Sequence, residues 1–118
     1  IVYVASPEEA KAMAEAGADA IIAHVGCTTG GSIGVTDAAM SLDDAAKATQ
    51  AIIDAGKTVR DDVIYLSHGG PISTPDDAAF INEKTDAVGF VGASSLERMA
   101  VEDSLTELTK QFKAIPLK

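Results

Sequence analysis

The sequence predicts an α/β fold, with one domain over residues 1–118 built around a parallel β-sheet. Three observations support this prediction: four short apolar runs rich in β-branched residues, a recognisable helix start after each run, and the regular alternation of the two. The length of 118 residues suits one domain, and the chain contains no linker or low-complexity segment. The expected strands are Ile1–Val4, Asp19–Ala23, Val63–Leu66 and Ala87–Val91.

A helix start can be read after each expected strand. Ser6-Pro7-Glu8-Glu9 has a capping serine, a proline at the first helical position and a glutamate at the third. Ser94-Ser95-Leu96-Glu97 also matches a capping box, and the starts at Ser41 and Thr74 carry Asp in place of Glu. We expect the helices to end near Glu15, Ala55, Lys84 and Phe112, with Gly17 and Gly56 as stops after the first two.

Strand–helix units repeated in this way are compatible with two architectures. One is an open sheet that is complete as it stands, and the other is half of an eight-unit TIM-type (β/α)8 barrel, which needs about 250 residues. The chain opens at Ile1 inside an expected strand and has no initiator Met, which favours the C-terminal half of a barrel whose N-terminal half is missing. Because a half barrel exposes two sheet edges, we expect a homo-oligomer or pairing with the missing half.

The composition limits the kinds of binding partner and the cellular compartment that we expect for this chain. The net charge of −9, with 9 scattered lysine and arginine residues, argues against nucleic-acid and anionic membrane partners. Many of the acids stand at expected helix starts, where they suit the helix dipole. No run approaches the roughly 18 apolar residues of a membrane span. The lone Cys27 fits a reducing compartment, so we expect a cytoplasmic protein.

Two histidines stand where the chemistry of such a fold is expected. Parallel α/β folds bind ligands at the C-terminal ends of their strands. His24 follows the second expected strand and His68 the third, and imidazole groups suit proton transfer near neutral pH. Each could equally be a capping or core histidine. Glu97 is a further candidate acid or base, although its place in a capping box also explains it.

Glycines after the third and fourth expected strands predict an anion site. Glycine allows backbone N–H groups to approach a phosphate or carboxylate, and a helix N-terminus adds partial positive charge. The alternative is a pair of tight turns with an ordinary capping serine. The candidate binding residues are Gly69, Gly70, Gly92, Ala93, Ser94, Ser95 and Arg98.

The connection from His24 to Met40 is far longer than the usual 2–6 or so residues between a strand and a helix. Its uncharged residues Thr28, Thr29, Gly30, Gly31 and Ser32 suit a lid over a polar ligand, and the alternative is a loop without a ligand. Cys27 could join the two histidines at a metal ion, but a further histidine or carboxylate is lacking, and we predict no metal. The residues identify no cofactor.

Three stretches carry a resemblance to a known family: "EEAKAMAEAGADAIIAHVGCTTGGSIG", "HGGPISTPDDAAF" and "GFVGASSLERMAVE". They resemble the phosphoenolpyruvate hydrolase-like TIM-barrel proteins, and a related barrel occurs in a plant antiviral resistance protein. The resemblance implies barrel strands five to eight. It places the ligand at His24, Thr28 to Ser32, His68 to Gly70, and Gly92 to Ser95 with Glu97 and Arg98.

The resemblance also implies a reaction, water attack on a phosphoenolpyruvate-like or phosphonopyruvate-like substrate. Together with the candidate site it predicts a hydrolase or lyase that acts on a small anionic metabolite, phosphorylated or a keto acid. The histidines would move a proton and the glycine amides would hold the anion. The alternative is a barrel without turnover that senses a ligand or binds another protein.

Overall fold

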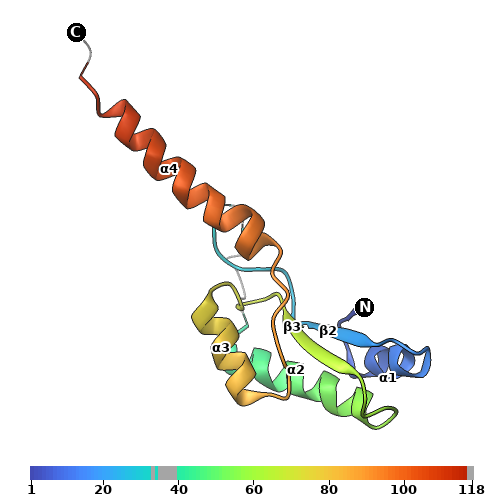
Figure 1. Ribbon diagram of the computed structural model, residues 1–118. Coiled ribbons are helices and arrows are strands. Elements are labelled where there is room, and N and C mark those ends of the chain that lie inside the picture. The colour runs from blue at the N-terminus through green and yellow to red at the C-terminus, as the bar shows by residue number, and fades with distance from the viewer. Residues whose placement is uncertain (33, 35–39, 117–118) are drawn as a thin grey trace.

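A computed structural model describes residues 1–32, 34 and 40–116. Strands β1 (Val2–Val4), β2 (Ala20–His24) and β3 (Ile64–His68) form a parallel sheet in the order β1-β2-β3 (Figure 1). The α/β class and the parallel strands are therefore confirmed. The described sheet is open, so a complete TIM barrel stays a prediction.

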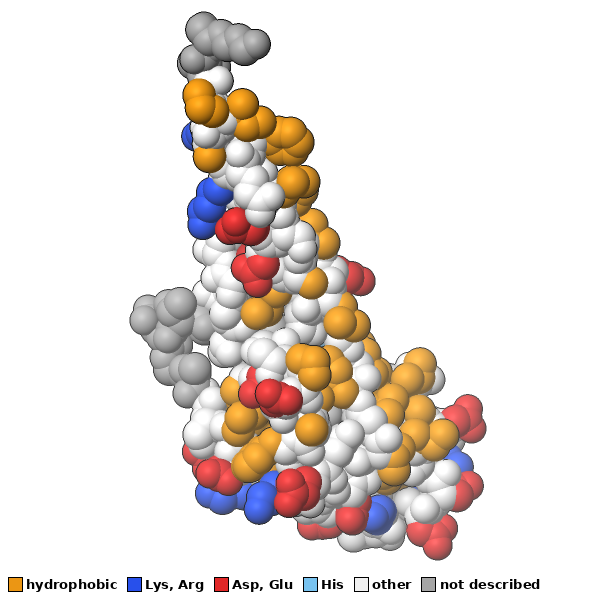
Figure 2. All heavy atoms as spheres, turned by 60° about the vertical axis from the view of Figure 1, so that its left-hand side comes forward, with side chains coloured by type: hydrophobic (Ala, Val, Ile, Leu, Met, Phe, Trp, Pro, Cys, Tyr) orange, Lys and Arg blue, Asp and Glu red, His pale blue; other side chains and the backbone are white. Residues whose placement is uncertain are grey.

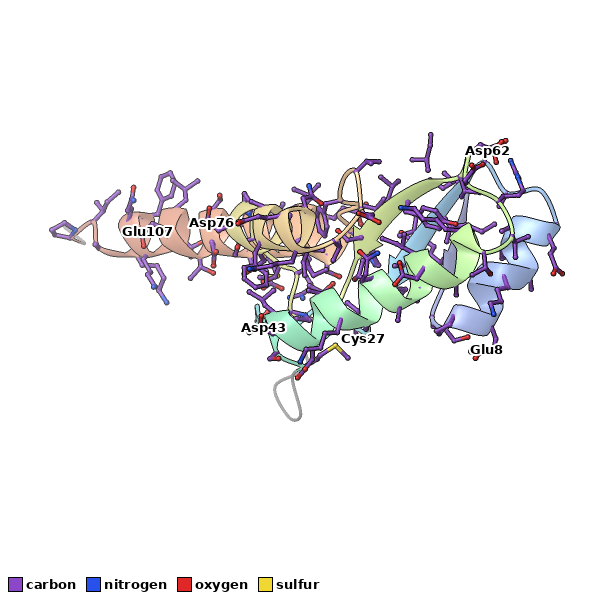
Figure 3. All side chains as sticks on the ribbon, turned by 90° about the horizontal axis from the view of Figure 1, so that it is seen from below. Glu8, Cys27, Asp43, Asp62, Asp76 and Glu107 are labelled. Carbon is purple, nitrogen blue, oxygen red and sulfur yellow. The ribbon has the colours of Figure 1, made fainter. Side chains whose placement is uncertain are left out.

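The helices alternate with the strands as the sequence predicts. They are α1 (Pro7–Glu15), α2 (Leu42–Lys57), α3 (Pro75–Lys84) and α4 (Ala100–Lys113), the last entered through a π-helical turn, η1 (Ser95–Met99). The acids Glu8, Asp43 and Asp76 lie in the first turns of α1, α2 and α3 (Figure 3). This placement stabilises the helices through their dipoles. Helix α4 projects away from the other elements (Figure 1).

The fourth expected strand is shorter than predicted. Val91 N–H donates to Ser67 O at 2.9 Å, and Ser67 N–H donates to Gly89 O at 2.9 Å. Phe90 forms a single parallel bridge with Ser67, so this part of the chain is an extended edge segment rather than a full strand. Glycine inside a strand weakens pairing, which accounts for the brief ladder around Gly89.

The two faces of the sheet differ in what covers them. The helix-covered face packs against α1 and α2, and its buried core includes Val4, Ala10, Ile21, Ala23, Ile53 and Tyr65. On the open face, Tyr3 and Ile64 are 51% and 52% exposed, so no described helix covers them. The register places Tyr3, Ile22, His24, Leu66 and His68 on this open face.

The two glycines expected to stop helices have different roles. Gly17 ends α1 with a φ of 89°, and Ala18 N–H donates back to Met13 O at 3.0 Å, as in a Schellman motif. The prediction for Gly56 is wrong, because α2 continues to Lys57. A Cβ atom at Gly56 would collide with the Tyr65 hydroxyl, so this glycine allows α2 to approach β3 closely. Burial raises the pKa of the Tyr65 phenol.

Three of the four predicted helix caps are present. Ser6 and Ser41 each accept the amide of the third helical residue, and Thr74 forms a complete capping box with Asp77. The prediction for Ser94 is wrong, because its backbone is helical (φ −56°, ψ −31°) and its side chain makes no capping bond. A helical φ/ψ at this position cannot place the hydroxyl over the first turn. Glu97 is therefore no capping acid.

A clamp joins the loop after β2 to the start of α4. Arg98 Nη1 lies 3.1 Å from Glu102 Oε1, and Arg98 Nη2 donates to Gly30 O at 3.2 Å. Glu102 Oε2 accepts the Ser32 N–H at 3.0 Å. Gly31 has a φ of 72°, and a Cβ atom there would collide with the Arg98 guanidinium. Hydrogen bonds from Ser32, and then from Arg98, hold the pKa of Glu102 below its ordinary value.

We expect Asp77→Ala to lower the free energy of unfolding by about 1 kcal/mol, because it removes the acceptor of the Ser73 and Thr74 amides. Burial raises the pKa of Asp77, but hydrogen bonds from Thr74 and Ser73 hold it below the ordinary 3.8. This stabilisation is therefore present above that value and is lost as the pH falls through the lowered one. Urea unfolding at neutral and acidic pH measures both effects. Asp76→Ala, which lies outside the capping box, is the control, and an equal loss there would contradict the assignment.

We expect Glu102→Gln to loosen residues 30–32, because it removes the negative charge that holds Arg98 and Ser32 together. In the unchanged protein the contact is complete above the ordinary pKa of 4.5 and is lost as the pH falls through the lowered value. Amide hydrogen exchange at Ser32 measures the loosening. Glu107→Gln, on the same helix (Figure 3), is the matched control because Glu107 bonds only to Gln111 among the described side chains. Unchanged exchange in Glu102→Gln would show that the clamp does not hold the loop.

Candidate functional site

The structure brings the two histidines together at the C-terminal ends of their strands. The register pairs His24 of β2 directly with His68 of β3, and their ring centroids lie 5.0 Å apart. His68 is 8% exposed, whereas His24 is partly buried. The predicted pair is thus placed at the edge of the sheet where this class of fold binds ligands.

Each imidazole is held by one backbone group. The group at His24 is an N–H donor, and the group at His68 is a carbonyl acceptor. Gly26 N–H donates to His24 Nδ1 at 3.2 Å, so in the neutral ring the proton lies on His24 Nε2. His68 Nδ1 lies 2.6 Å from Val91 O. A carbonyl oxygen can only accept, so Nδ1 carries the proton and His68 Nε2 bears the lone pair. One histidine therefore offers a donor and its neighbour an acceptor.

A third aromatic ring, Tyr3, completes the cluster and was missed in the sequence. Its ring lies edge-on to both histidines, 5.0 Å from His68 and 5.8 Å from His24 between centroids. The signal for it is the register of β1 on β2, which aligns Tyr3 with Ile22 and so puts it on the face of His24. Register cannot be read from one sequence that has only short apolar strands.

A cavity of about 290 Å³ opens beside this cluster. It is lined by Tyr3, Val4, Ala5, Glu9 and His24. Glu9 stands in the first turn of α1, and its Oε2 accepts the Ala5 N–H at 2.6 Å. This hydrogen bond holds the carboxylate in the lining of the cavity. A small metabolite has room next to His24, and Glu9 is a second lining residue that sequence reasoning did not select.

The glycine turn after β3 is hydrogen-bonded to the start of the long loop that follows β2. Gly69 and Gly70 both have positive φ, 82° and 57°. Gly70 N–H donates to Gly26 O at 2.7 Å, and Thr29 N–H donates to Gly70 O at 3.0 Å. The Gly70 amide is thus engaged within the fold, and an anion bound here would use other donors. Thr28 and Thr29 are partly buried, whereas Gly30, Gly31 and Ser32 are exposed and lie toward α4.

The second glycine segment begins beside His68. The carbonyl oxygen of Val91 is hydrogen-bonded to His68. Val91 is followed by Gly92, Ala93, Ser94 and Ser95. Ala93 O accepts the first helical bonds, from Leu96 and Glu97, so the amides of Ala93 to Ser95 precede the hydrogen-bonded turn. Ser95 lines a separate cavity of about 240 Å³, with Ser73, Thr74, Pro75, Phe90 and Leu96. Ser95 is thus the predicted anion residue that lines this second cavity, and the cavity at His24 is lined by none of the predicted anion residues.

The charged candidates Glu97 and Arg98 do not line the cavity at His24. Arg98 is engaged with Glu102 and Gly30, so its charge holds the loop. Glu97 is exposed on η1. Within residues 1–32, 34 and 40–116, no group of three or more His, Cys, Asp or Glu side chains is placed to hold a metal ion. Cys27 is exposed (Figure 3), and no described helix has the length and apolarity to cross a membrane.

Known proteins resemble this chain closely. A protein of Solanum lycopersicum, the ToMV resistance protein Tm-1(GCR237), is 50% identical over 116 residues, which are 98% of this chain and 15% of that protein. The ToMV susceptible protein tm-1(GCR26) of the same plant matches equally well, at 50% identity with the same shares. A protein of Sinorhizobium fredii described as a transcriptional regulator, y4pA, is 30% identical over 115 residues, 98% of this chain and 19% of its own.

The chain thus spans less than one fifth of the length of these relatives. The family model described as phosphoenolpyruvate hydrolase-like matches residues 1–115, nearly the whole sequence. The extent of that match and the identity to the tomato proteins lead to one conclusion. The chain belongs to the phosphoenolpyruvate hydrolase-like family.

Proposed function

We propose that this chain carries the proton-transfer part of an active site in a TIM-barrel hydrolase or lyase. The substrate is a small phosphorylated compound or keto acid, bound at the C-terminal ends of the strands. The observation that carries the proposal is the pair His24 and His68, which lie side by side with a donor on one ring and a lone pair on the other.

His68 is the general base. Its Nε2 lone pair takes a proton from the attacking water or from the substrate. The ring then becomes an imidazolium, and Val91 O, already bonded to Nδ1–H at 2.6 Å, stabilises the charge that develops. Because His68 is 8% exposed, bulk water competes little for its lone pair.

His24 is the donor. Its Nε2–H points a partial positive charge at an oxygen of the substrate that gains negative charge during the reaction. Gly26 N–H fixes this tautomer by bonding Nδ1. The cavity lined by Tyr3, Glu9 and His24 gives the substrate its place beside this donor. Catalysis would then follow from two neutral imidazoles held in different tautomers.

The anionic group of the substrate is held next to this pair. The amides of Gly92, Ala93 and Ser94 follow Val91, the partner of His68, and precede the first helical bond. Gly69 and Gly92 allow the backbone to approach the anion. Thr28 and Thr29 supply hydroxyls from the loop that is hydrogen-bonded to Gly70. Arg98 holds the loop and Ser95 lines the second cavity, so neither is assigned to the anion.

A second candidate function is a sensing or interaction barrel without turnover. It is favoured by the descriptions of the relatives, a transcriptional regulator in Sinorhizobium fredii and proteins of ToMV resistance and susceptibility in tomato. In that case the histidines bind a metabolite and change no bond in it. Binding of a phosphorylated or keto acid without product formation would support this candidate against the enzyme.

We expect His68→Asn to reduce turnover at least about 100-fold with little change in melting temperature. The Asn amide can still donate to Val91 O from the place of Nδ1, whereas the lone pair of Nε2 is lost. The measurement is product formation from a panel of phosphorylated and keto acids, followed by phosphorus and proton NMR.

The matched control is Ser67→Ala, the fully buried neighbour on the helix-covered face, which should lower stability and leave turnover unchanged. His24→Asn keeps an acceptor for Gly26 N–H and should also reduce turnover. Full turnover in His68→Asn would contradict the proposed base, and so would a loss of turnover that only follows a loss of stability.

A further inference from the structure

The cavity of about 290 Å³ beside His24 is lined by a carboxylate and by none of the residues predicted to hold an anion. Its lining residues are Tyr3, Val4, Ala5, Glu9 and His24. They come from β1, the turn after it, the first turn of α1 and the end of β2. An ionised carboxylate only accepts hydrogen bonds, and it repels a second anion. The cavity therefore suits a part of the substrate that carries hydrogen-bond donors.

Glu9 is held in place through one of its two carboxylate oxygens. Oε2 accepts the Ala5 N–H at 2.6 Å, and the Glu9 N–H donates to Ser6 Oγ at 3.2 Å, which fixes the backbone at the start of α1. Among the described residues, Oε1 accepts no hydrogen bond and no lysine or arginine forms a salt bridge with Glu9. Because Glu9 is also exposed, a ligand in the cavity can reach a fixed negative charge.

Tyr3 adds an aromatic ring to the lining of this cavity. It is 51% exposed on the open face of the sheet, and its ring lies 5.8 Å from that of His24 between centroids. Aromatic rings attract cations through their faces. A charge-assisted hydrogen bond to a carboxylate is also about twice as strong as one from a neutral donor. Since no lysine or arginine lines the cavity, an ammonium group of a ligand suits it better than a hydroxyl group does.

The histidine pair separates this cavity from the predicted anion donors. Along the C-terminal ends of the strands, β1 and the cavity come first, β2 and β3 with the two histidines follow, and the edge segment 88–91 comes last. The amides of Gly92, Ala93 and Ser94 follow this segment. Neighbouring strands are about 4.8 Å apart, so the outermost of these positions are separated by about 14 Å. An ammonium group at Glu9 and an anion at Gly92 therefore belong to opposite ends of an extended ligand.

We propose that the cavity lined by Tyr3, Glu9 and His24 binds a primary ammonium group of the substrate, with Glu9 as its counter-ion. This inference rests on the proposed function and adds a specificity-determining residue to it. The substrate is then an extended molecule with a phosphate or carboxylate at one end and an ammonium group at the other. The histidine pair lies between the two ends, beside the part of the substrate that reacts. An α-amino acid, whose two charged groups share one carbon, does not fit this arrangement.

Three acids of nearly equal length test the ammonium group. They are ε-aminocaproate, caproate and ε-hydroxycaproate, which end in an ammonium, a methyl and a hydroxyl group. Each is titrated into the 118-residue chain at one salt concentration, and NMR follows the imidazole signals of His24 and His68. We expect ε-aminocaproate to bind at least about tenfold more tightly than the other two acids, because only its ammonium group makes a charge-assisted hydrogen bond to Glu9. The largest shifts should fall on His24, the histidine that lines the cavity.

Glu9→Gln tests the counter-ion. The variant keeps an oxygen that can accept the Ala5 N–H, so the start of α1 is preserved, but it removes the negative charge. It should weaken the binding of ε-aminocaproate at least about tenfold and leave the binding of caproate nearly unchanged. Retained binding of caproate shows that the variant is folded and that the rest of the site is intact.

Glu8→Gln is the matched control. Acidic side chains lie both on α4 and on the body of the molecule (Figure 2), and the net charge is −9, so a cation is also attracted without a specific site. Glu8 lies in the same turn of α1 as Glu9 but does not line the cavity (Figure 3). Its replacement removes the same charge from the chain and should leave the preference for ε-aminocaproate unchanged.

Equal binding of the three acids, binding of ε-hydroxycaproate as tight as that of ε-aminocaproate, or a preference that survives in Glu9→Gln would overturn the ammonium site. An unshifted His24 signal at up to about 50 mM ε-aminocaproate would overturn it as well. Turnover distinguishes this inference from the proposed function. The expected preference without product from any acid would contradict the enzyme and support the ammonium site. Product from acids that lack an amine, at rates unaffected by Glu9→Gln, would contradict the ammonium site and support the enzyme.

Discussion

The parallel register between β2 and β3 is the constraint on which the rest of the site depends. It pairs Ile21 with Tyr65 on the helix-covered face and His24 with His68 on the open face. Ile21 and Tyr65 are buried against α1 and α2, so a slip of either strand by one residue would expose its core side chains and turn its histidine into the core. Burial of Ile21 and Tyr65 on one face therefore determines that the two histidines lie together on the other face.

Backbone groups at the strand ends then set the state of each imidazole. Gly26 N–H comes two residues after His24, and Val91 O comes from the edge segment beyond β3. Gly70 N–H bonds Gly26 O, so the turn after β3 braces the segment that orients His24. The edge segment is equally part of the site, because its pairing with Ser67 brings Val91 to His68.

The sequence was informative wherever the determinants are local. Three of the four predicted strands and three of the four predicted helix caps, at Ser6, Ser41 and Thr74, are confirmed, because these signals act within a few residues. It was less informative where the determinant lies far along the chain. Gly56 packs on Tyr65 of another element, and Ser94 enters a helix through a π-helical turn.

The residues of the candidate site show the same contrast between local and long-range determinants. His24 and His68 could be proposed because each ends an expected strand, whereas Tyr3 depends on the register between strands. Arg98 looked like an anion ligand, but its partners Gly30 and Glu102 form a clamp with Ser32, 70 residues before Glu102. Long-range contacts of this kind leave no pattern in a single sequence.

The tautomers of the two histidines show whether Gly26 and Val91 determine which ring nitrogen carries the proton. Long-range proton–nitrogen correlation spectra of the imidazoles report which ring nitrogen carries the proton in each. The two backbone contacts predict protonated Nε2 in His24 and protonated Nδ1 in His68. The same tautomer in both rings would show that Gly26 and Val91 do not set their states, and would contradict the donor and base assigned to them.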